Sequence, residues 1–217
     1  MSTGPLAGVT IVEFASLGPG PYAAMLLADM GASVIRIERP DATAAPATAI
    51  SQRGRAQRYA ADLKNPQDLD CVRDLLRNAD ALIEGFRPGT MERLNLGPDV
   101  VLRDNPRLVY GRITGWGQTG PLKSTAGHDI NFISVTGALA AIGPKERPVL
   151  PLNLIGDFAG GSMFLVTGML AALLAARRTG DGQVIDAAMC DGVISLMTAI
   201  HEQVAAGEWM EARESNL

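Results

Sequence analysis

Cysteine and histidine are scarce in this sequence of 217 residues, with two of each. Cys71 and Cys190 lie far apart and show no CxxC or Cys/His ligand spacing, which argues against a disulfide framework and against a zinc site. Two free cysteines suit a reducing compartment. The start of the chain, residues 1–5, lacks the basic stretch and apolar run of a signal peptide. We therefore expect a cytoplasmic protein without a metal site.

An excess of one charge and a long apolar run are also missing. The formal net charge is -4 and 19% of the residues are charged, with no dense basic stripe, so we expect no nucleic-acid partner. The longest nearly apolar run covers residues 163–176. It is shorter than the roughly 20 residues that a bilayer span needs. This run predicts a buried core helix and no membrane partner.

What the sequence does contain is an alternation of strand-like and helix-like segments, in a composition that is 47% hydrophobic. Strands are expected at 9–14, 33–38, 58–63, 79–84 and 107–114, and helices at 22–30, 65–77 and 98–104, from about 159, and from about 187. A polar loop is expected at 40–57. This order predicts an α/β fold with a Rossmann-like parallel sheet and helices on both faces. Ligands of such folds bind at the carboxyl ends of the strands.

Two groups of residues at these strand ends are candidates for ligand binding. The glycine-proline turn at 18–21 is either a plain turn or a helix start that favours an anion. Arg39, Lys64 and Arg87 each lie at or just after an expected strand. They are either solvated surface residues or contacts to an anionic ligand such as a nucleotide phosphate.

Two further residues are candidates for acid/base chemistry. His128 lies at a junction between a loop and a helix, where a structural histidine and a functional one are both open. Asp157 lies between an apolar stretch and a long helix, so it is either an N-cap or a carboxylate within a pocket. His201, on the late helix, is expected to be a surface or packing residue.

Several long motifs resemble a known family. Residues 4–40, ADLKN at 61–65, IEGFRPGTMERLNLG at 83–97 and YGRITGWGQTGP at 110–121 resemble the class III CoA-transferase family. Within it, GHDINF at 127–132, PLNLIGDFAGGSMF at 151–164 and GQVIDAAMCDG at 182–192 resemble the α-methylacyl-CoA racemase branch. The resemblance follows the chain in order over essentially its whole length.

The resemblance implies a reaction. Transferases of the family use an aspartate nucleophile, and Asp157 occupies the matching position. Racemases need a second acid/base on the opposite face of the carbon, and His128 matches the histidine that fills this role. The implied enzyme is an isomerase that interconverts (2R)- and (2S)-2-methylacyl-CoA thioesters by proton transfer through an enolate. The alternatives are a class III CoA-transferase acting through Asp157 and a truncated, inactive CoA-binding fragment.

The resemblance also implies the ligand contacts. CoA would be part of the acyl-CoA thioester substrate, so no separate cofactor is implied. The residues matching the family's CoA nucleotide contacts are Arg39, Ala61, Asp62, Leu63 and Lys64, with Arg87 a candidate for the phosphates. Those matching the thioester and pantetheine path are Gly127, Asp129, Ile130, Asn131 and Phe132. Phe132 stands where these racemases commonly have tyrosine.

Domain organisation is the last implication of the resemblance. It divides the chain into a large CoA-binding domain at 1–190 and a helix at 191–217 that leads toward a small domain, before which the sequence stops. Members of the family form interlocked homodimers, so a homodimer is the expected assembly. A glutamate from the later region, which orients the histidine in the racemases, has no counterpart here.

Overall fold

The computed structural model of the chain describes residues 3–41 and 54–216, and it contains a six-stranded parallel sheet. The strands lie in the order β3-β2-β1-β4-β5-β6. Their bounds are Thr10–Phe14 (β1), Ser33–Glu38 (β2), Arg55–Ala60 (β3), Ala81–Glu84 (β4), Val109–Thr114 (β5) and Val184–Ala188 (β6). This is the strand order of dinucleotide-binding folds. Successive strands are added on one side of β1 as far as β3 and then on its other side from β4, so the strand order reverses between β1 and β4 while all strands stay parallel. The predicted α/β class is confirmed.

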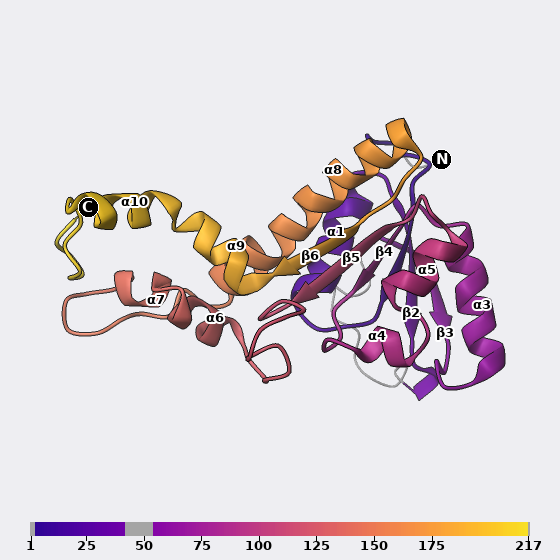
Figure 1. The fold of residues 1–217 in the computed structure, drawn as a ribbon, viewed down its shortest axis with the longest axis horizontal. Helices are drawn as coiled ribbons and strands as arrows, with labels where there is room; N and C mark the ends of the chain where they lie inside the picture. The colour runs from indigo at the N-terminus through magenta and orange to yellow at the C-terminus, as the bar shows by residue number, and fades with distance from the viewer. Residues whose placement is uncertain (1–2, 42–53, 217) are drawn as a thin grey trace.

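Helices cover both faces of this sheet, as predicted (Figure 1). On one face lie α1 (Pro19–Asp29) and α8 (Phe164–Thr179), and on the other α3 (Pro66–Arg77), α4 (Thr90–Arg93) and α5 (Pro98–Asp104). Residues on alternate positions of a strand point to opposite faces. Accordingly, Ile11 and Ile83 join the core beside α1 and α8, whereas Val12 and Leu82 join the core beside α3, α4 and α5.

A second group of helices extends away from the sheet and carries the C-terminus (Figure 1). It consists of α6 (Asp129–Val135), α7 (Ala138–Ala141), α9 (Met189–Leu196) and α10 (Thr198–Ala206). Ile133, Ala138, Val193 and Met197 form a small core of their own here. Helix α10 has no buried residue. Helices α6 and α9 meet at this core, and both also pack against the π-helix at residues 154–163.

The apolar run at 163–176 belongs to one continuous helical stretch, Leu154–Thr179, formed by the π-helix η2 (Leu154–Met163) and α8. Its length and composition would allow it to cross a membrane, a property shared by core helices of soluble proteins. In this fold it packs against β5 and β6 and buries Leu165, Val166 and Met169. The predicted core helix is confirmed.

The structure corrects several boundaries. The strand expected at 58–63 is β3, which begins within the expected loop and ends at Ala60; residues 42–53 of that loop lie outside the described part. Strand β6 was not predicted, because it is short, polar in part and largely exposed at the edge of the sheet. The helix expected from about 187 begins at Met189 and divides into α9 and α10. Helix α1 begins at Pro19, three residues early, since Pro19 lies at its first position.

The packing of α8 predicts a sharp contrast between two leucines of the same helix. Leu165 is fully buried and Leu174 is 61% exposed. We expect Leu165→Ala to lower the free energy of unfolding by about 2–5 kcal/mol, because it leaves a cavity against the sheet, and Leu174→Ala to change it by less than about 0.5 kcal/mol. Urea unfolding followed by circular dichroism measures both. Equal losses would contradict this packing.

Candidate active site

A cavity of about 600 Å³ lies at the carboxyl ends of β1, β2 and β3. We call it the β2–β3 cavity. Its lining contains Arg39, which follows β2, and the run Ala61 to Lys64, which follows β3. These five residues were predicted as CoA contacts from separate segments, and the structure brings them together. Arg39 and Lys64 are exposed and supply the cations of a lining that also contains Glu38, Asp41 and Asp62.

Local hydrogen bonds hold the loop after β3 in place. The backbone N–H of Asp62 donates to Asp68 Oδ2 at 2.8 Å, and the N–H of Lys64 donates to Asp62 Oδ1 at 3.0 Å. Asn65 then caps α3 by accepting from the N–H of Gln67 at 2.9 Å. The Asp62 carboxylate thus shapes the turn that presents Lys64.

A second cavity, of about 450 Å³, contains both candidates for acid/base chemistry, and we call it the His128–Asp157 cavity. Gly18 and Pro19 of the turn before α1, Arg87, Gly127 and Phe132 also line it. Phe86 lines this cavity and the β2–β3 cavity as well. The two cavities are therefore neighbours with a shared wall, and a single elongated ligand could occupy both.

His128 is the N-cap residue of α6. Its backbone N–H donates to Asn131 Oδ1 at 3.0 Å, which fixes the start of the helix. The residue is exposed. An exposed imidazole on the wall of a cavity is available to a ligand, so the capping role and the functional role are compatible.

Asp157 lies in the first turn of η2, whose N-cap is Asn153. It is therefore not the N-cap that its sequence context suggested, because the helix begins at Leu154, before the expected start near Ala159. The side-chain amide of Asn153 donates to Asp157 Oδ2 at 3.5 Å. Gly18 has a φ of +64°, which favours glycine, and a β-carbon there would lie 3.7 Å from Asp157 Oδ2. The turn at 18–21 thus forms the wall opposite the carboxyl group.

The pKa of the Asp157 carboxyl is raised above its ordinary value, first by burial and then by the negative charge of Asp129. The hydrogen bond from Asn153 and the charge of His128 act in the opposite direction. Burial and a like charge both disfavour the anion. The site therefore increases the protonated fraction of Asp157 at a given pH.

Three residues expected along the pantetheine path line neither of these two cavities. Asp129 is buried, and its Oδ2 accepts from the backbone N–H of Asp157 at 2.7 Å. Ile130 and Asn131 are exposed on α6. The Asn131 side chain accepts the hydrogen bond from the His128 N–H at the start of this helix. Phe132 does reach the cavity, and its ring contacts Trp116 edge-on with centroids 4.8 Å apart.

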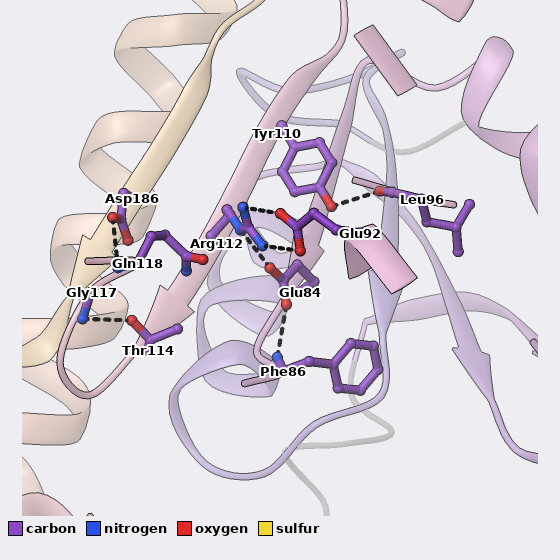
Figure 2. Close-up of polar contacts among 10 residues, drawn as sticks. All are labelled: Glu84, Phe86, Glu92, Leu96, Tyr110, Arg112, Thr114, Gly117, Gln118 and Asp186. Carbon is purple, nitrogen blue, oxygen red and sulfur yellow. Dashed lines mark hydrogen bonds and ion pairs between the residues drawn. The ribbon is translucent and has the colours of Figure 1, made fainter. Parts of the chain in front are cut away.

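Sequence reasoning missed a polar network that positions Phe86 (Figure 2). The carboxylate of Glu84, buried at the end of β4, accepts from the Phe86 N–H and from Arg112 Nε, both at 2.8 Å. Arg112 also donates to both carboxylate oxygens of Glu92 on α4, at 2.8 and 3.3 Å. Burial raises the pKa of Glu84 despite these hydrogen bonds. The sequence does contain a signal for this network, because Glu84 ends an otherwise apolar strand and therefore needs a buried partner.

Lys123 was also missed. It lines the His128–Asp157 cavity from the segment that follows β5. Lys123 does not directly follow a strand, unlike Arg39, Lys64 and Arg87, so its position along the sequence did not indicate a place at the strand ends. The cavity thus carries a second cation besides Arg87.

The sheet order and the position of the two adjoining cavities at the strand ends are those of a fold that binds nucleotide-containing ligands there. The family model described as CoA-transferase family III matches residues 6–216. The chain belongs to this family.

Individual relatives include both chemistries of the family. The chain is 42% identical to the α-methylacyl-CoA racemase of Homo sapiens over 98% of its own length and 55% of the relative. It is 34% identical to the succinate–glutarate CoA-transferase of Agrobacterium fabrum, covering 86% of this chain and 51% of that one. A CAIB/BAIF family protein from Brucella suis has a similar crystal structure, with a TM-score of 0.82, 29% identity and coverage of 94% and 58%. The chain spans about half the length of the curated relatives.

The Glu84 network predicts a large cost for removing its cation. We expect Arg112→Met to lower the free energy of unfolding by about 3–5 kcal/mol, because it leaves the Glu84 charge buried without its partner. The exposed Arg103 lies 4.0 Å from Asp104, and Arg103→Met should cost less than about 1 kcal/mol. Chemical denaturation compares the two variants. The interpretation fails if they cost the same.

The raised pKa of Asp157 predicts a pH-dependent effect of Asp157→Asn on stability. A carboxyl whose pKa is higher in the folded chain stabilises the fold fully below its unfolded pKa, and this contribution is lost as pH rises through the folded value. The amide of the variant does not titrate. The quantity to compare is the melting temperature of Asp157→Asn minus that of the unsubstituted chain. This difference should be more positive at pH 7 than at pH 3.5. A constant difference across this range would contradict the raised pKa.

Proposed function

We propose that this chain supplies the CoA-binding and proton-transfer residues of an α-methylacyl-CoA racemase, an isomerase acting on 2-methylacyl-CoA thioesters. The observation that carries the proposal is the placement of His128 and Asp157 on one cavity beside the β2–β3 cavity. A CoA transferase needs only the aspartate. A second acid/base group in the same cavity is what inversion at a carbon requires.

The proposed chemistry follows from the two side chains. A neutral His128 removes the α-proton of one enantiomer, and a protonated Asp157 delivers a proton to the opposite face of the resulting enolate. The other enantiomer reacts in reverse, with Asp157 as the base. The first direction uses the acid form of Asp157, and the reverse direction uses its carboxylate together with a protonated His128. A raised pKa of Asp157 supports the first of these two states.

The β2–β3 cavity supports the CoA part of the proposal. Arg39 and Lys64 are placed to bind phosphate, the arginine through its planar fork and the lysine as a point charge. The thioester would then extend past Phe86 into the His128–Asp157 cavity. Arg87, on that side of Phe86, would meet a group nearer the thioester and not the nucleotide.

A CoA-transferase activity through Asp157 is the second candidate, and the succinate–glutarate CoA-transferase among the relatives favours it. In this reaction the Asp157 carboxylate would attack the thioester carbonyl, so the acid form of the residue would be inactive. The raised pKa of Asp157 therefore favours the racemase. Activity and assembly into a homodimer are proposed for the protein to which the chain contributes, because the chain covers 55% of the human racemase.

Isotope exchange tests the proposal. A 2-methylacyl-CoA is incubated with the chain in deuterated water, and α-deuterium is measured by mass spectrometry. We expect incorporation without any acid acceptor, and a loss of about 10²-fold or more in His128→Ala and in Asp157→Asn, since each removes one acid/base group. The matched control is His201→Ala, which removes the other, exposed histidine of the arm and should exchange normally.

Two outcomes would contradict the racemase. Exchange that requires an added carboxylic acid, and that survives His128→Ala, would indicate the transferase. Binding of CoA without any exchange would indicate a CoA-binding fragment. CoA binding by each variant, measured by calorimetry, separates a loss of chemistry from a loss of affinity.

The Lys64→Met variant should bind CoA more weakly in the same calorimetric measurement and should leave the fold intact.

A further inference from the structure

A buried carboxylate lies directly behind Asp157. Asp129 is 5% exposed, and its Oδ2 accepts the backbone N–H of Asp157 at 2.7 Å. Its Oδ1 is also buried and makes no hydrogen bond within the described residues. A buried carboxylate that uses one oxygen and leaves the other unpaired is costly. This cost calls for a compensating role.

The packing around Asp129 is tight enough to fix its position. A β-carbon on Gly156 would lie 2.8 Å from Asp129 Oδ2 and 2.9 Å from its Cγ, closer than such atoms approach. Only glycine at position 156 therefore lets η2 approach this carboxylate. The sequence places the glycine directly before Asp157, where the close approach is needed.

We propose that Asp129 is a positioning residue that anchors the backbone of Asp157 and, as a second buried carboxylate, favours the acid form of the Asp157 side chain. This inference deepens the proposed racemase and rests on it for its functional meaning. Two carboxyl groups that share a poorly solvated site do not both ionise easily. A racemase uses the acid form of Asp157 in the direction in which this residue delivers the proton, whereas a nucleophilic aspartate reacts only as the carboxylate.

The other ionisable groups around Asp157 do not account for the same effect. Helix η2 packs against α1, α6, α8, α9, β5 and β6. The ionisable groups near the Asp157 end of these elements, or on the walls of its cavity, are Tyr22, Arg87, Arg112, Lys123, His128, Asp129, Asp186, Cys190 and Asp191. Most are cations or are engaged elsewhere: Arg112 with Glu84, Asp186 with the N–H of Gln118, and Cys190 with Asp191. Asp129 is the anion that acts on the pKa of Asp157, and His128 opposes it.

The test is a titration that does not depend on turnover. The chain is labelled with ¹³C at aspartate carboxyl carbons, and the Asp157 signal is assigned by its loss in Asp157→Asn. We expect its midpoint in the unsubstituted chain to lie above the ordinary range for aspartate. Asp129→Asn keeps an oxygen that can accept the Asp157 N–H but removes the charge. This substitution should lower the midpoint of the Asp157 signal, because the like charge beside it is removed.

The pH profile of α-proton exchange provides the functional readout. In Asp129→Asn, the part of the pH–rate profile that depends on the ionisation of Asp157 should move to lower pH, by the same amount as the NMR midpoint. The affinity for CoA should stay the same. An unchanged midpoint in a folded Asp129→Asn chain would overturn the proposal, even if exchange were lost. If the variant does not fold, the unsubstituted chain still decides: an ordinary midpoint for Asp157 overturns the proposal. If no exchange occurs but the midpoint shifts, the racemase fails and the carboxylate coupling stands.

Discussion

The parallel register of the six strands is the constraint on which the rest of the structure depends. Because every strand runs in the same direction, all carboxyl ends meet at one edge of the sheet, and the reversal between β1 and β4 opens the space there. Helices on both faces bury the central strands β1, β4 and β5. A polar side chain within these strands must therefore find its partner on a neighbouring strand.

Two ion pairs satisfy this requirement in the same way on either side of the reversal. Glu13 of β1 is the register partner of Arg36 on β2, and Glu84 of β4 is the register partner of Arg112 on β5. Both glutamates are buried and both accept from their arginine, at 2.5 and 2.8 Å. Register thus decides which charges meet. The second pair has a direct consequence for the site, since Glu84 also holds the backbone of Phe86 between the two cavities.

The sequence predicted the elements whose pattern is local, and it missed what depends on contacts distant in the chain. Strands β1 and β2 are apolar and β-branched, so their positions were predicted to within a residue. Strand β6 is recognisable only through its pairing with β5. Likewise, motif resemblance placed His128 and Asp157 in one site, but the role of Asp129 depends on a contact across 28 residues. The family resemblance alone had assigned Asp129 to the ligand path.

Two adjacent residues at the start of α6, His128 and Asp129, both contribute to the candidate site. His128 precedes the helix in an extended conformation, with φ of -128° and ψ of 171°, and Asp129 is its first residue. Consecutive residues at such a junction point in different directions, so the imidazole lines the cavity while the carboxylate is buried against η2. In the proposed reaction, one peptide unit would therefore supply one acid/base group and act on the other. Any movement of α6 would move both residues together, so the small core that α6 shares with α9 helps fix their positions at the cavity.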